Sequence, residues 1–499
     1  MNANFYAAIE AANRDRLRQD FLETETGRTF TYGDLARESA RYANLLTGLG
    51  ARRGDRIAVQ VEKSPASLFL YLGCLRAGLI YLPLNIAYQR GELSYFLGDA
   101  EPMAIVCQPP AAALMQELCG GRSQVVTLNE DGGGTLEDAS AAAAHDFETA
   151  EMQPGDSAVI VYTSGTTGRS KGATVTHQNL ASNARVLVDF WKFGTNDVLL
   201  HALPMFHVHG LFVANHCALL AGAKLLWHRR FDVGLVMRDL SRASVMMGVP
   251  TFYTRLLNET SFTSAMCNNV RLFVSGSAPL QLETFKGFEV RTGKTILERY
   301  GMSEAGMISS NPLSGERRGG TVGLPLPGIS VRIADERDRA VGKGITGAIQ
   351  VKGENVFAGY WRMPEKTREE FTADGYFRTG DVGVFDRDGY LSIVGRAKDL
   401  IISGGYNVYP KEIELVLDAL PGVAESAVIG LPHPDFGEAV TAVVVPQKDA
   451  SLDSAAVIGA VQKTLANYKV PKVVHFVDDL PRNAMGKVQK ALLRERYGK

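Results

Sequence analysis

Short apolar runs alternate with helical patterns over the first two-thirds of the chain. Runs typical of buried strands stand between segments whose apolar residues recur at helical spacing. Strands that alternate with helices favour parallel sheets with helices packed on their faces. The predicted strands are residues 57–61, 79–82, 104–107, 158–161, 225–227, 245–249 and 272–274, and the predicted helices are residues 65–77, 91–99 and 233–240. The pattern therefore predicts an α/β fold.

The pattern changes after Tyr300. Short β-rich runs separated by Gly and Asp predict a β-rich subdomain at 330–333, 347–351 and 390–394. The final hundred residues predict a small α+β module, with helices at 410–420 and 454–465 and strands at 426–430, 440–445 and 473–477. We therefore expect a large N-terminal domain over residues 1–396 and a small C-terminal domain over residues 397–499.

The composition excludes several classes of protein. The 499 residues are 45% hydrophobic and 21% charged, with a net charge of −1, so we expect no nucleic-acid partner. The five cysteines are scattered without a Cys-x-x-Cys pair, which indicates reduced thiols. The most apolar segment, 68–84, is interrupted by Arg76 and Pro83, so we expect no membrane span and a cytoplasmic location. The sequence leaves the oligomeric state open.

A loop rich in Gly, Ser and Thr follows the predicted strand 158–161. Residues 163–172 read Thr-Ser-Gly-Thr-Thr-Gly-Arg-Ser-Lys-Gly. Glycines let backbone N–H groups approach a polyphosphate closely, while hydroxyls donate to its oxygens and cations offset its charge. Ser170 stands where a Walker A loop needs its second glycine, and Gly172 follows the lysine. The loop therefore predicts a phosphate site of another kind.

Six motifs in a fixed order extend this interpretation over nearly the whole chain. They are residues 163–172, Tyr-Gly-Met-Ser-Glu at 300–304, Tyr-Phe-Arg-Thr-Gly-Asp at 376–381, Gly-Arg-Ala-Lys-Asp at 395–399, Asn-Val-Tyr-Pro-Lys-Glu-Ile-Glu at 407–414 and Pro-Arg-Asn-Ala-Met-Gly-Lys at 481–487. In this set the chain resembles the adenylate-forming superfamily of acyl-CoA synthetases, adenylation domains and luciferases. Phe-His-Val-His-Gly at 206–210 and Leu-Glu-Arg-Tyr-Gly-Met-Ser-Glu at 297–304 are most similar to the malonyl-CoA synthetases.

The resemblance implies a reaction with two half-steps. A carboxylate attacks the α-phosphorus of ATP, which gives an acyl adenylate and pyrophosphate. The thiol of coenzyme A then displaces AMP. The resemblance thus implies ATP, Mg²⁺, coenzyme A and a small carboxylic acid as partners, since cations must shield the two anions that react.

The resemblance also assigns roles around the nucleotide. Lys171, with Thr163, Ser164, Gly165, Thr166, Thr167 and Gly168, would hold the β- and γ-phosphates. Glu304, with Thr163, would hold Mg²⁺, and Ser303 would contact the α-phosphate. The residues implied for the adenosine are Asp381 and Arg396 at the ribose, and Tyr300, Gly301, Gly276, Ser277 and Ala278 around the base. Read alone, Ser303-Glu304 could be a helix N-cap pair, and the Thr-Gly-Asp that ends in Asp381 reads as a turn.

The mobile parts are implied by the same likeness. Lys487 would contact the substrate carboxylate and the α-phosphate during adenylation. Lys398 matches the family hinge, about which the C-terminal domain would rotate between half-steps. Ser403, Gly404 and Gly405 would then line the tunnel for the thiol of coenzyme A, where side chains would obstruct it.

Arg299 is the residue that we expect to set the acid specificity. A buried Arg can bind a carboxylate through two parallel hydrogen bonds, and a dicarboxylate such as malonate has a second anionic end to anchor. The alternative without a role in binding is that Arg299 forms an ion pair with Glu298. His207 and Met302 would border the substrate, with a weaker case for His209. Val208, Met307 and Leu324 would limit the pocket size, and methylmalonate would be tolerated.

Other functions stay open at this stage. A fatty-acyl or aryl-CoA ligase would use the same machinery, and a stand-alone adenylation enzyme could load a separate carrier protein. A nucleotide-binding regulator derived from the same fold is the non-enzymatic alternative. Retention of Lys171, Glu304, Asp381 and Lys487 argues against it.

Overall fold

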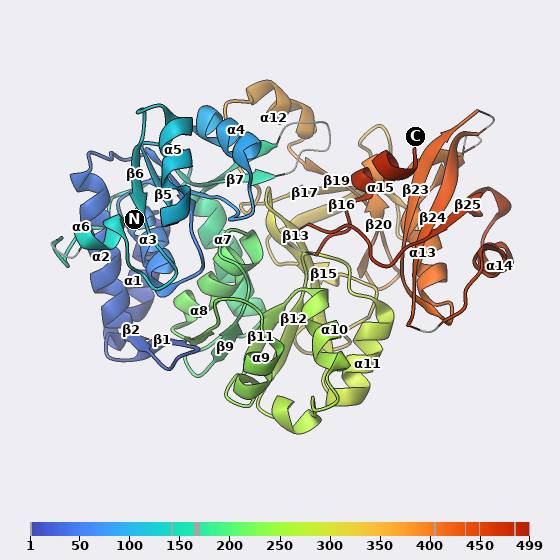
Figure 1. The fold of residues 1–499 in the computed structure, drawn as a ribbon, viewed down its shortest axis with the longest axis horizontal. Coiled ribbons are helices and arrows are strands. Elements are labelled where there is room, and N and C mark those ends of the chain that lie inside the picture. Colours follow the sequence, from blue (N-terminus) through green and yellow to red (C-terminus); the bar gives the residue numbers. More distant parts are fainter. Residues whose placement is uncertain are drawn as a thin grey trace.

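The computed structural model of the chain contains four β-sheets (Figure 1). It describes residues 2–140, 143–163, 170–403, 406–434, 436–448, 450–483 and 486–498. Two large sheets with their helices form the N-terminal part, a small antiparallel sheet follows, and the last sheet lies at the opposite end of the molecule (Figure 1).

The seven-stranded sheet has the order β18-β8-β7-β4-β3-β5-β6. Its strands are β3 (Arg56–Gln60), β4 (Ile80–Pro83), β5 (Ala104–Cys107), β6 (Gln124–Thr127), β7 (Ser157–Thr163), β8 (Lys171–Thr176) and β18 (Gly359–Tyr360). The central strands are parallel, whereas β7 and β8 pair antiparallel. The predicted phosphate loop therefore joins two antiparallel strands.

The nine-stranded sheet has the order β15-β14-β13-β12-β11-β9-β10-β1-β2. Its strands are β1 (Asp20–Thr24), β2 (Thr29–Thr31), β9 (Val198–His201), β10 (Lys224–Trp227), β11 (Val245–Gly248), β12 (Leu272–Ser275), β13 (Ile296–Met302), β14 (Gly306–Ser310) and β15 (Leu324–Pro325). The six strands from β1 to β13 in this order are parallel, and the edges are antiparallel. The carboxyl ends of β9, β12 and β13 thus open at one edge, where α/β sheets bind ligands.

One hydrophobic core joins the two large sheets. It contains side chains from both sheets and from the helices between them, among them Phe5, Leu46, Leu72, Leu187 and Leu219. The helices of this part are α1 (Phe5–Asn13), α2 (Tyr32–Gly48), α3 (Pro65–Arg76), α4 (Arg90–Ala100), α5 (Ala112–Cys119), α6 (Thr135–Ser140), α7 (His177–Phe190), α8 (Asn215–Ala221), α9 (Val233–Leu240), α10 (Pro250–Asn258) and α11 (Leu282–Thr292). The α/β prediction is confirmed.

The small antiparallel sheet is the predicted β-rich subdomain. It has the order β16-β17-β19-β20, with β16 (Ser330–Ala334), β17 (Gly347–Lys352), β19 (Phe377–Phe385) and β20 (Leu391–Arg396), and α12 (Pro364–Glu370) precedes β19. The prediction of a turn at Asp381 is wrong, since this residue lies inside β19. Gly380 has φ +74° and the pairing with β17 slips beside it, so a bulge and not a chain reversal explains the glycine.

The last sheet forms an α+β unit, as predicted. Its order is β22-β21-β24-β23, with β25 paired to β24. The strands are β21 (Ile401–Ser403), β22 (Tyr406–Val408), β23 (Val423–His433), β24 (Gly437–Pro446) and β25 (Val473–Phe476), and the helices are α13 (Pro410–Asp418), α14 (Ser454–Thr464) and α15 (Lys490–Tyr497). This unit has its own hydrophobic core, and the turn Ala397–Asp399 links it to β20. The domain boundary at residue 397 stays a prediction.

Two further expectations can be compared with the structure. All five cysteines are free and buried. Among the described helices, none combines the length and the apolar character that crossing a bilayer requires.

Candidate active site

Arg299 stands on β13 as a buried cation. Its side chain is 3% exposed, and among the described residues neither Nε nor Nη2 has a hydrogen-bond partner. Burial lowers the pKa of Arg299 to about 10. The predicted alternative, an ion pair with Glu298, does not form: Glu298 Oε2 is itself unpartnered, and Oε1 accepts from Leu280 N–H at 3.0 Å. Two buried donors without acceptors suit an anionic ligand.

Gly276 leaves the space that the Arg299 guanidinium fills. A Cβ at Gly276 would lie 2.3 Å from Cζ of Arg299 and 2.4 Å from Nη1. The neighbouring Ser277 has φ +71°, a strained conformation for a residue with a side chain, and Ala278 is half-buried. The loop after β12, predicted only for nucleotide binding, therefore also shapes the surroundings of Arg299.

His207 and His209 face this cation. Burial, with repulsion from Lys487 and then Arg299, lowers the pKa of His207 to about 3. Burial and Arg299 also hold the pKa of His209 well below its ordinary value. His209 Nδ1 lies 3.2 Å from Ser277 Oγ, while its Nε2 has no described partner. Both imidazoles are therefore neutral and can serve a bound anion only as hydrogen-bond donors.

Lys487 lies on a short hairpin of the C-terminal unit, within electrostatic range of Arg299. Arg482 and Val488 pair as an antiparallel bridge, and Asn483 N–H donates to Lys487 O at 3.0 Å. The residue stays accessible to solvent, yet Asp381, Glu304 and Arg299 all contribute to the pKa of its amine. Loss of solvation, followed by repulsion from Arg396, lowers the pKa of Lys487 to about 8. The structure thus brings the predicted adenylation lysine to Arg299 and His207.

Asp381 contacts two other residues that were predicted for the adenosine, Tyr300 and Arg396. Tyr300 Oη donates to Asp381 Oδ2 at 2.5 Å, and Arg396 Nε lies 2.9 Å from Oδ1. Burial raises the pKa of Tyr300 well above its ordinary value, so the phenol keeps its proton. Each carboxylate oxygen retains a lone pair for a further donor. The three residues come from β13, β19 and the end of β20, which explains why their grouping needs the fold.

Glu304 lies in the turn between β13 and β14, so the alternative of a helix N-cap is wrong for Ser303 and Glu304. Its Oε1 accepts from Thr163 Oγ1 at 3.3 Å and from Tyr360 Oη at 3.2 Å. Burial raises the pKa of Glu304. The predicted metal pair, Thr163 and Glu304, is therefore together, although no group of three His, Cys, Asp or Glu side chains that could hold a metal occurs among the described residues.

Gly301 and Met302 end β13 just before this turn. A Cβ at Gly301 would lie 2.2 Å from Gly306 O and 2.4 Å from Cε of Met307, so the close approach of β13 and β14 requires glycine. Met302 is half-buried and packs against the core of the small antiparallel sheet.

Lys171 begins β8 with its side chain largely buried. Its Nζ lies 3.3 Å from Glu370 Oε1 and 4.2 Å from the centroid of the Tyr360 ring. Sequence reasoning missed both Tyr360 and Glu370. No local motif marks them, and Glu370 is 199 residues from Lys171 in the chain.

Several predicted residues lie outside the described part of the chain. Ser164, Gly165, Thr166, Thr167 and Gly168 of the phosphate loop belong to this set, as do Gly404 and Gly405 of the predicted thiol tunnel. Their neighbours are described: Ser403 is buried at the end of β21, and Lys398 lies in the turn before that strand.

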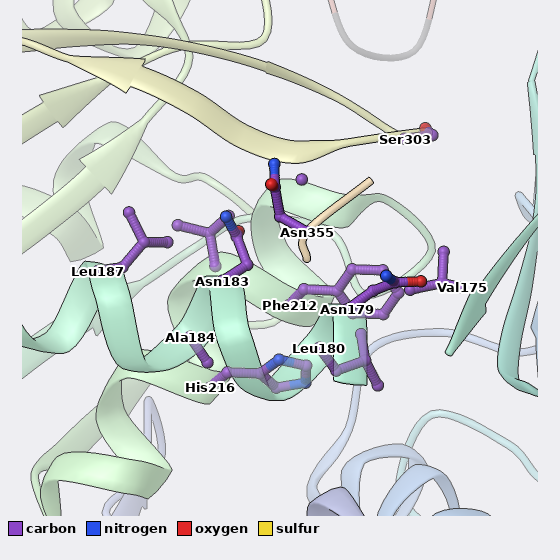
Figure 2. A pocket seen from close by; sticks show the side chains of 12 residues that line it. Val175, Asn179, Leu180, Asn183, Ala184, Leu187, Phe212, His216, Ser303 and Asn355 are labelled. Atoms are coloured by element: carbon purple, nitrogen blue, oxygen red, sulfur yellow. The ribbon is translucent and has the colours of Figure 1, made fainter. Parts of the chain in front are cut away.

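A small cavity lies behind the Ser303 turn, mainly between α7 and the segment that leads into α8 (Figure 2). Asn179, Leu180, Asn183, Ala184 and Leu187 of α7 line it together with Phe212 and His216, and Ser303 and Asn355 lie on its far side. Ser303 is the one predicted site residue among the described residues that line it. The cavity is thus separate from the group formed by His207, Arg299 and Lys487.

The described residues therefore form two adjoining groups. Arg299, His207 and Lys487 offer positive charge and neutral donors to an acid, whereas Asp381 and Glu304 offer oxygens to hydroxyl groups and to a cation. Lys487 connects the two groups, because it responds electrostatically to Arg299 on one side and to Asp381 and Glu304 on the other. This arrangement can hold a nucleotide and a carboxylate with their reacting ends together.

Comparisons with known proteins agree with this arrangement. A family model for AMP-binding enzymes matches residues 9–361, and a model for the AMP-binding enzyme C-terminal domain matches residues 412–487. The ATP-bound crystal structure of MatB from Rhodopseudomonas palustris is 51% identical, with a TM-score of 0.98 over 100% of this chain and 99% of that chain. The malonate–CoA ligase of Arabidopsis thaliana is 34% identical over 99% of this chain and 88% of its own length. A feruloyl-CoA synthase of an Amycolatopsis species is 36% identical over 95% of each chain.

The two family models together include both large sheets and most of the final α+β unit. The similarity to MatB extends over 100% of this chain, with 51% sequence identity. The chain therefore belongs to the AMP-binding enzyme family and is an AMP-forming acid–thiol ligase.

Proposed function

We propose that the protein is an ATP-dependent malonyl-CoA synthetase. It joins malonate to coenzyme A through malonyl adenylate, releasing pyrophosphate in the first half-reaction and AMP in the second. The similarity to the malonate–CoA ligase of Arabidopsis thaliana supports this substrate.

Arg299 carries the proposal. One carboxylate of malonate must point at phosphorus, so the other needs a counter-charge inside the pocket. The unpartnered Nε and Nη2 of Arg299 supply two parallel donors for it, and neutral His207 lies close by. An acid without the second carboxylate would leave both donors buried and unpaired.

In the first half-reaction, a malonate oxygen bonds to the α-phosphorus while the bond from phosphorus to the pyrophosphate oxygen breaks. Lys487 offsets the charge that the two anions bring together. Asp381 accepts from the ribose hydroxyls, with Tyr300 and Arg396 fixing its orientation. Lys171 and the loop after Thr163 bind the departing pyrophosphate.

Magnesium fits the pair Thr163 and Glu304. Both offer oxygen, which a hard cation prefers, and Mg²⁺ usually takes only one or two protein carboxylates because phosphates and waters complete its shell. When bound, the ion would neutralise charge on the phosphates. A buried Glu304 with a raised pKa would be stabilised as a carboxylate by that ion.

The second half-reaction uses coenzyme A. Its sulfur bonds to the acyl carbon and the bond from that carbon to the AMP oxygen breaks. The C-terminal domain, residues 397–499, rotates about Lys398 so that Lys487 leaves and the segment from Ser403 enters. Gly404 and Gly405 carry no side chain that would obstruct the thiol arm.

A feruloyl-CoA synthase activity is the second candidate, since one relative with that name is 36% identical over 95% of the chain. The buried charge of Arg299 argues against it, because an aromatic acid brings no second anion into the pocket. A competition experiment separates the two. The protein is given ATP, Mg²⁺ and coenzyme A with equal concentrations of malonate, methylmalonate, acetate and ferulate, and the thioesters are measured by mass spectrometry. We expect mainly malonyl-CoA with some methylmalonyl-CoA; feruloyl-CoA as the main product would refute the proposal.

A further inference from the structure

Lys63 is a buried lysine that lies outside the group of predicted site residues. It follows β3 and precedes α3, and only 4% of its surface is exposed. Nζ lies 2.7 Å from His201 O, 2.9 Å from His201 Nδ1 and 4.2 Å from the centroid of the Trp227 ring. All three contacts are uncharged groups. A lysine buried in this way is costly unless its donors do specific work.

His201 connects Lys63 to the segment that carries His207 and His209. It is the last residue of β9, and its Nε2 lies 3.0 Å from Gly210 O. Burial holds the pKa of Lys63 well below its ordinary value. The tautomer of His201 follows without its charge: a carbonyl oxygen can only accept, so Nε2 must carry the imidazole proton and donate it to Gly210 O, which leaves Nδ1 to accept from Lys63. Burial and the charge of Lys63 hold the pKa of His201 well below its ordinary value, so the ring is neutral.

Gly210 belongs to the segment that carries the substrate histidines. The π-helical turn His209–Ala214 begins there, and such turns are frequent at functional sites. A Cβ at Gly210 would lie 2.1 Å from Pro204 O, so this turn is closed by tight backbone contact. His209 N–H donates to His207 Nδ1 at 3.3 Å. Leu211 N–H, in the same peptide unit as Gly210 O, donates to His207 O at 2.8 Å, so a hydrogen bond that holds Gly210 O also restrains the backbone of His207.

We propose that Lys63 and His201 are positioning residues for acid binding. Neither belongs to the group around Arg299. Lys63 donates to Nδ1 of His201, and His201 anchors Gly210 so that His207 faces Arg299 and Lys487. The inference rests on the proposed function for its substrate, whereas the hydrogen-bonded chain itself can be tested without any acid.

The kinetic test replaces Lys63 by Met, which has similar length and no donor. Loss of the donor to His201 Nδ1 and to His201 O predicts that K63M raises the KM for malonate about tenfold while the KM for ATP stays near the wild-type value. K224M is the matched control, because Lys224 begins β10 at the end away from Trp227 and pairs with Glu23 and Asp20. Equal changes in both KM values, or none, in folded K63M would overturn the positioning role.

Two variants of His201 make the test independent of K63M folding. The side-chain amide of Gln can place an N–H near the position of Nε2, so H201Q should keep most of the malonate affinity, whereas H201F should lose it like K63M. Indistinguishable KM values for H201Q and H201F would contradict the account. Thermal unfolding midpoints of all variants show whether a loss reflects folding alone.

A spectroscopic measurement separates this inference from the proposed function. In ¹⁵N-histidine-labelled protein without substrate, His201 should appear as the neutral tautomer protonated on Nε2, and K63M should change the His207 and His209 signals. A proton on Nδ1 of His201 would refute the chain of contacts. Failure of wild-type protein to activate malonate, with the predicted tautomer present, would refute the proposed function alone.

Discussion

Arg299 shows how one buried side chain can define a substrate class. A guanidinium at 3% exposure, with two donors unpartnered in the described part of the chain, is unfavourable until an anion binds. Burying this cation costs free energy while no ligand is bound. An acid whose second carboxylate pairs with it would bind in preference to acids that lack that carboxylate. On the proposed function, specificity for a dicarboxylate rests on a cation that is in place before the acid binds.

Replacement of Arg299 tests this directly. Arg299→Met should reduce kcat/KM for malonate roughly 150- to 5,000-fold, which corresponds to ~3–5 kcal/mol, because the second carboxylate would be buried without a partner. Arg299→Lys keeps the charge but loses the fork of two donors and should fall between. Steady-state kinetics with malonate checks both, with the KM for ATP as the internal control. Wild-type efficiency in Arg299→Met would contradict the anchor role.

The sequence could predict Arg299, His207, Tyr300, Asp381, Glu304 and Lys487 as candidates, because each lies inside a short motif. The resemblance paired Glu304 with Thr163, and the two are in contact across 141 positions of the chain. It did not predict the direct contact of Asp381 with Tyr300 across 81 positions. Tyr360 and Glu370 were missed altogether, since each is an ordinary residue until the fold places it beside Lys171.

At the scale of elements, β12 and β13 act together. The glycine after β12 leaves room for the Arg299 side chain of β13, so the position of this guanidinium depends on a residue of the neighbouring loop. The sequence predicted Gly276 for nucleotide binding because a motif identifies only the loop to which a residue belongs. The contact between neighbouring strands is visible only in the fold.

Gly276→Ala should therefore behave like a weakened Arg299 variant. A Cβ 2.3 Å from Cζ forces the guanidinium to move, so we expect the KM for malonate to rise about tenfold or more. Gly395→Ala is a suitable control, because a Cβ there meets nothing within 4 Å. Initial rates at saturating ATP measure the effect, and an unchanged KM for malonate in Gly276→Ala would show that the pocket tolerates the shift.

The hairpin that carries Lys487 sets the pH response. With a pKa of about 8, the ammonium is charged below that pH and is lost as the pH rises through it. The kcat/KM for adenylation should thus fall on the alkaline side with an apparent pKa near 8. The kcat profile should fall at higher pH, because bound ATP favours the charged amine.

Lys487→Arg supplies the control for this profile, since guanidinium stays charged over the whole range. The alkaline fall near pH 8 should disappear from whatever activity this variant retains. Persistence of the same fall in Lys487→Arg would assign the titration to another group.

At the scale of the whole molecule, the α/β part and the final α+β unit both contribute residues to the candidate site. The alternation of strands and helices predicted the α/β part, and the change after Tyr300 predicted both smaller sheets. The pairing order could not be predicted, because strand neighbours such as β9 and β11 are separated by β10 in the chain. The placement of Lys487 beside Arg299 likewise depends on how the final unit docks.

On the proposed function, Lys487 serves one half-reaction. Lys487→Ala should stop the formation of malonyl adenylate, measured by pyrophosphate exchange, but spare thioester formation from malonyl adenylate that is supplied. The reason is that the rotated C-terminal domain would carry this lysine out of the cleft before the thiol reacts. Equal loss of both half-reactions would contradict the rotation.

The ratio of kcat/KM for malonate to kcat/KM for acetate tests the central claim most directly. A site built to pair a second carboxylate rejects an acid without one by roughly 10⁴–10⁵, whereas methylmalonate should lose only about 10–200-fold for its extra methyl group. We predict a malonate-to-acetate ratio in the first range for the wild-type protein, measured by AMP release with coenzyme A present. A ratio near one would contradict the account.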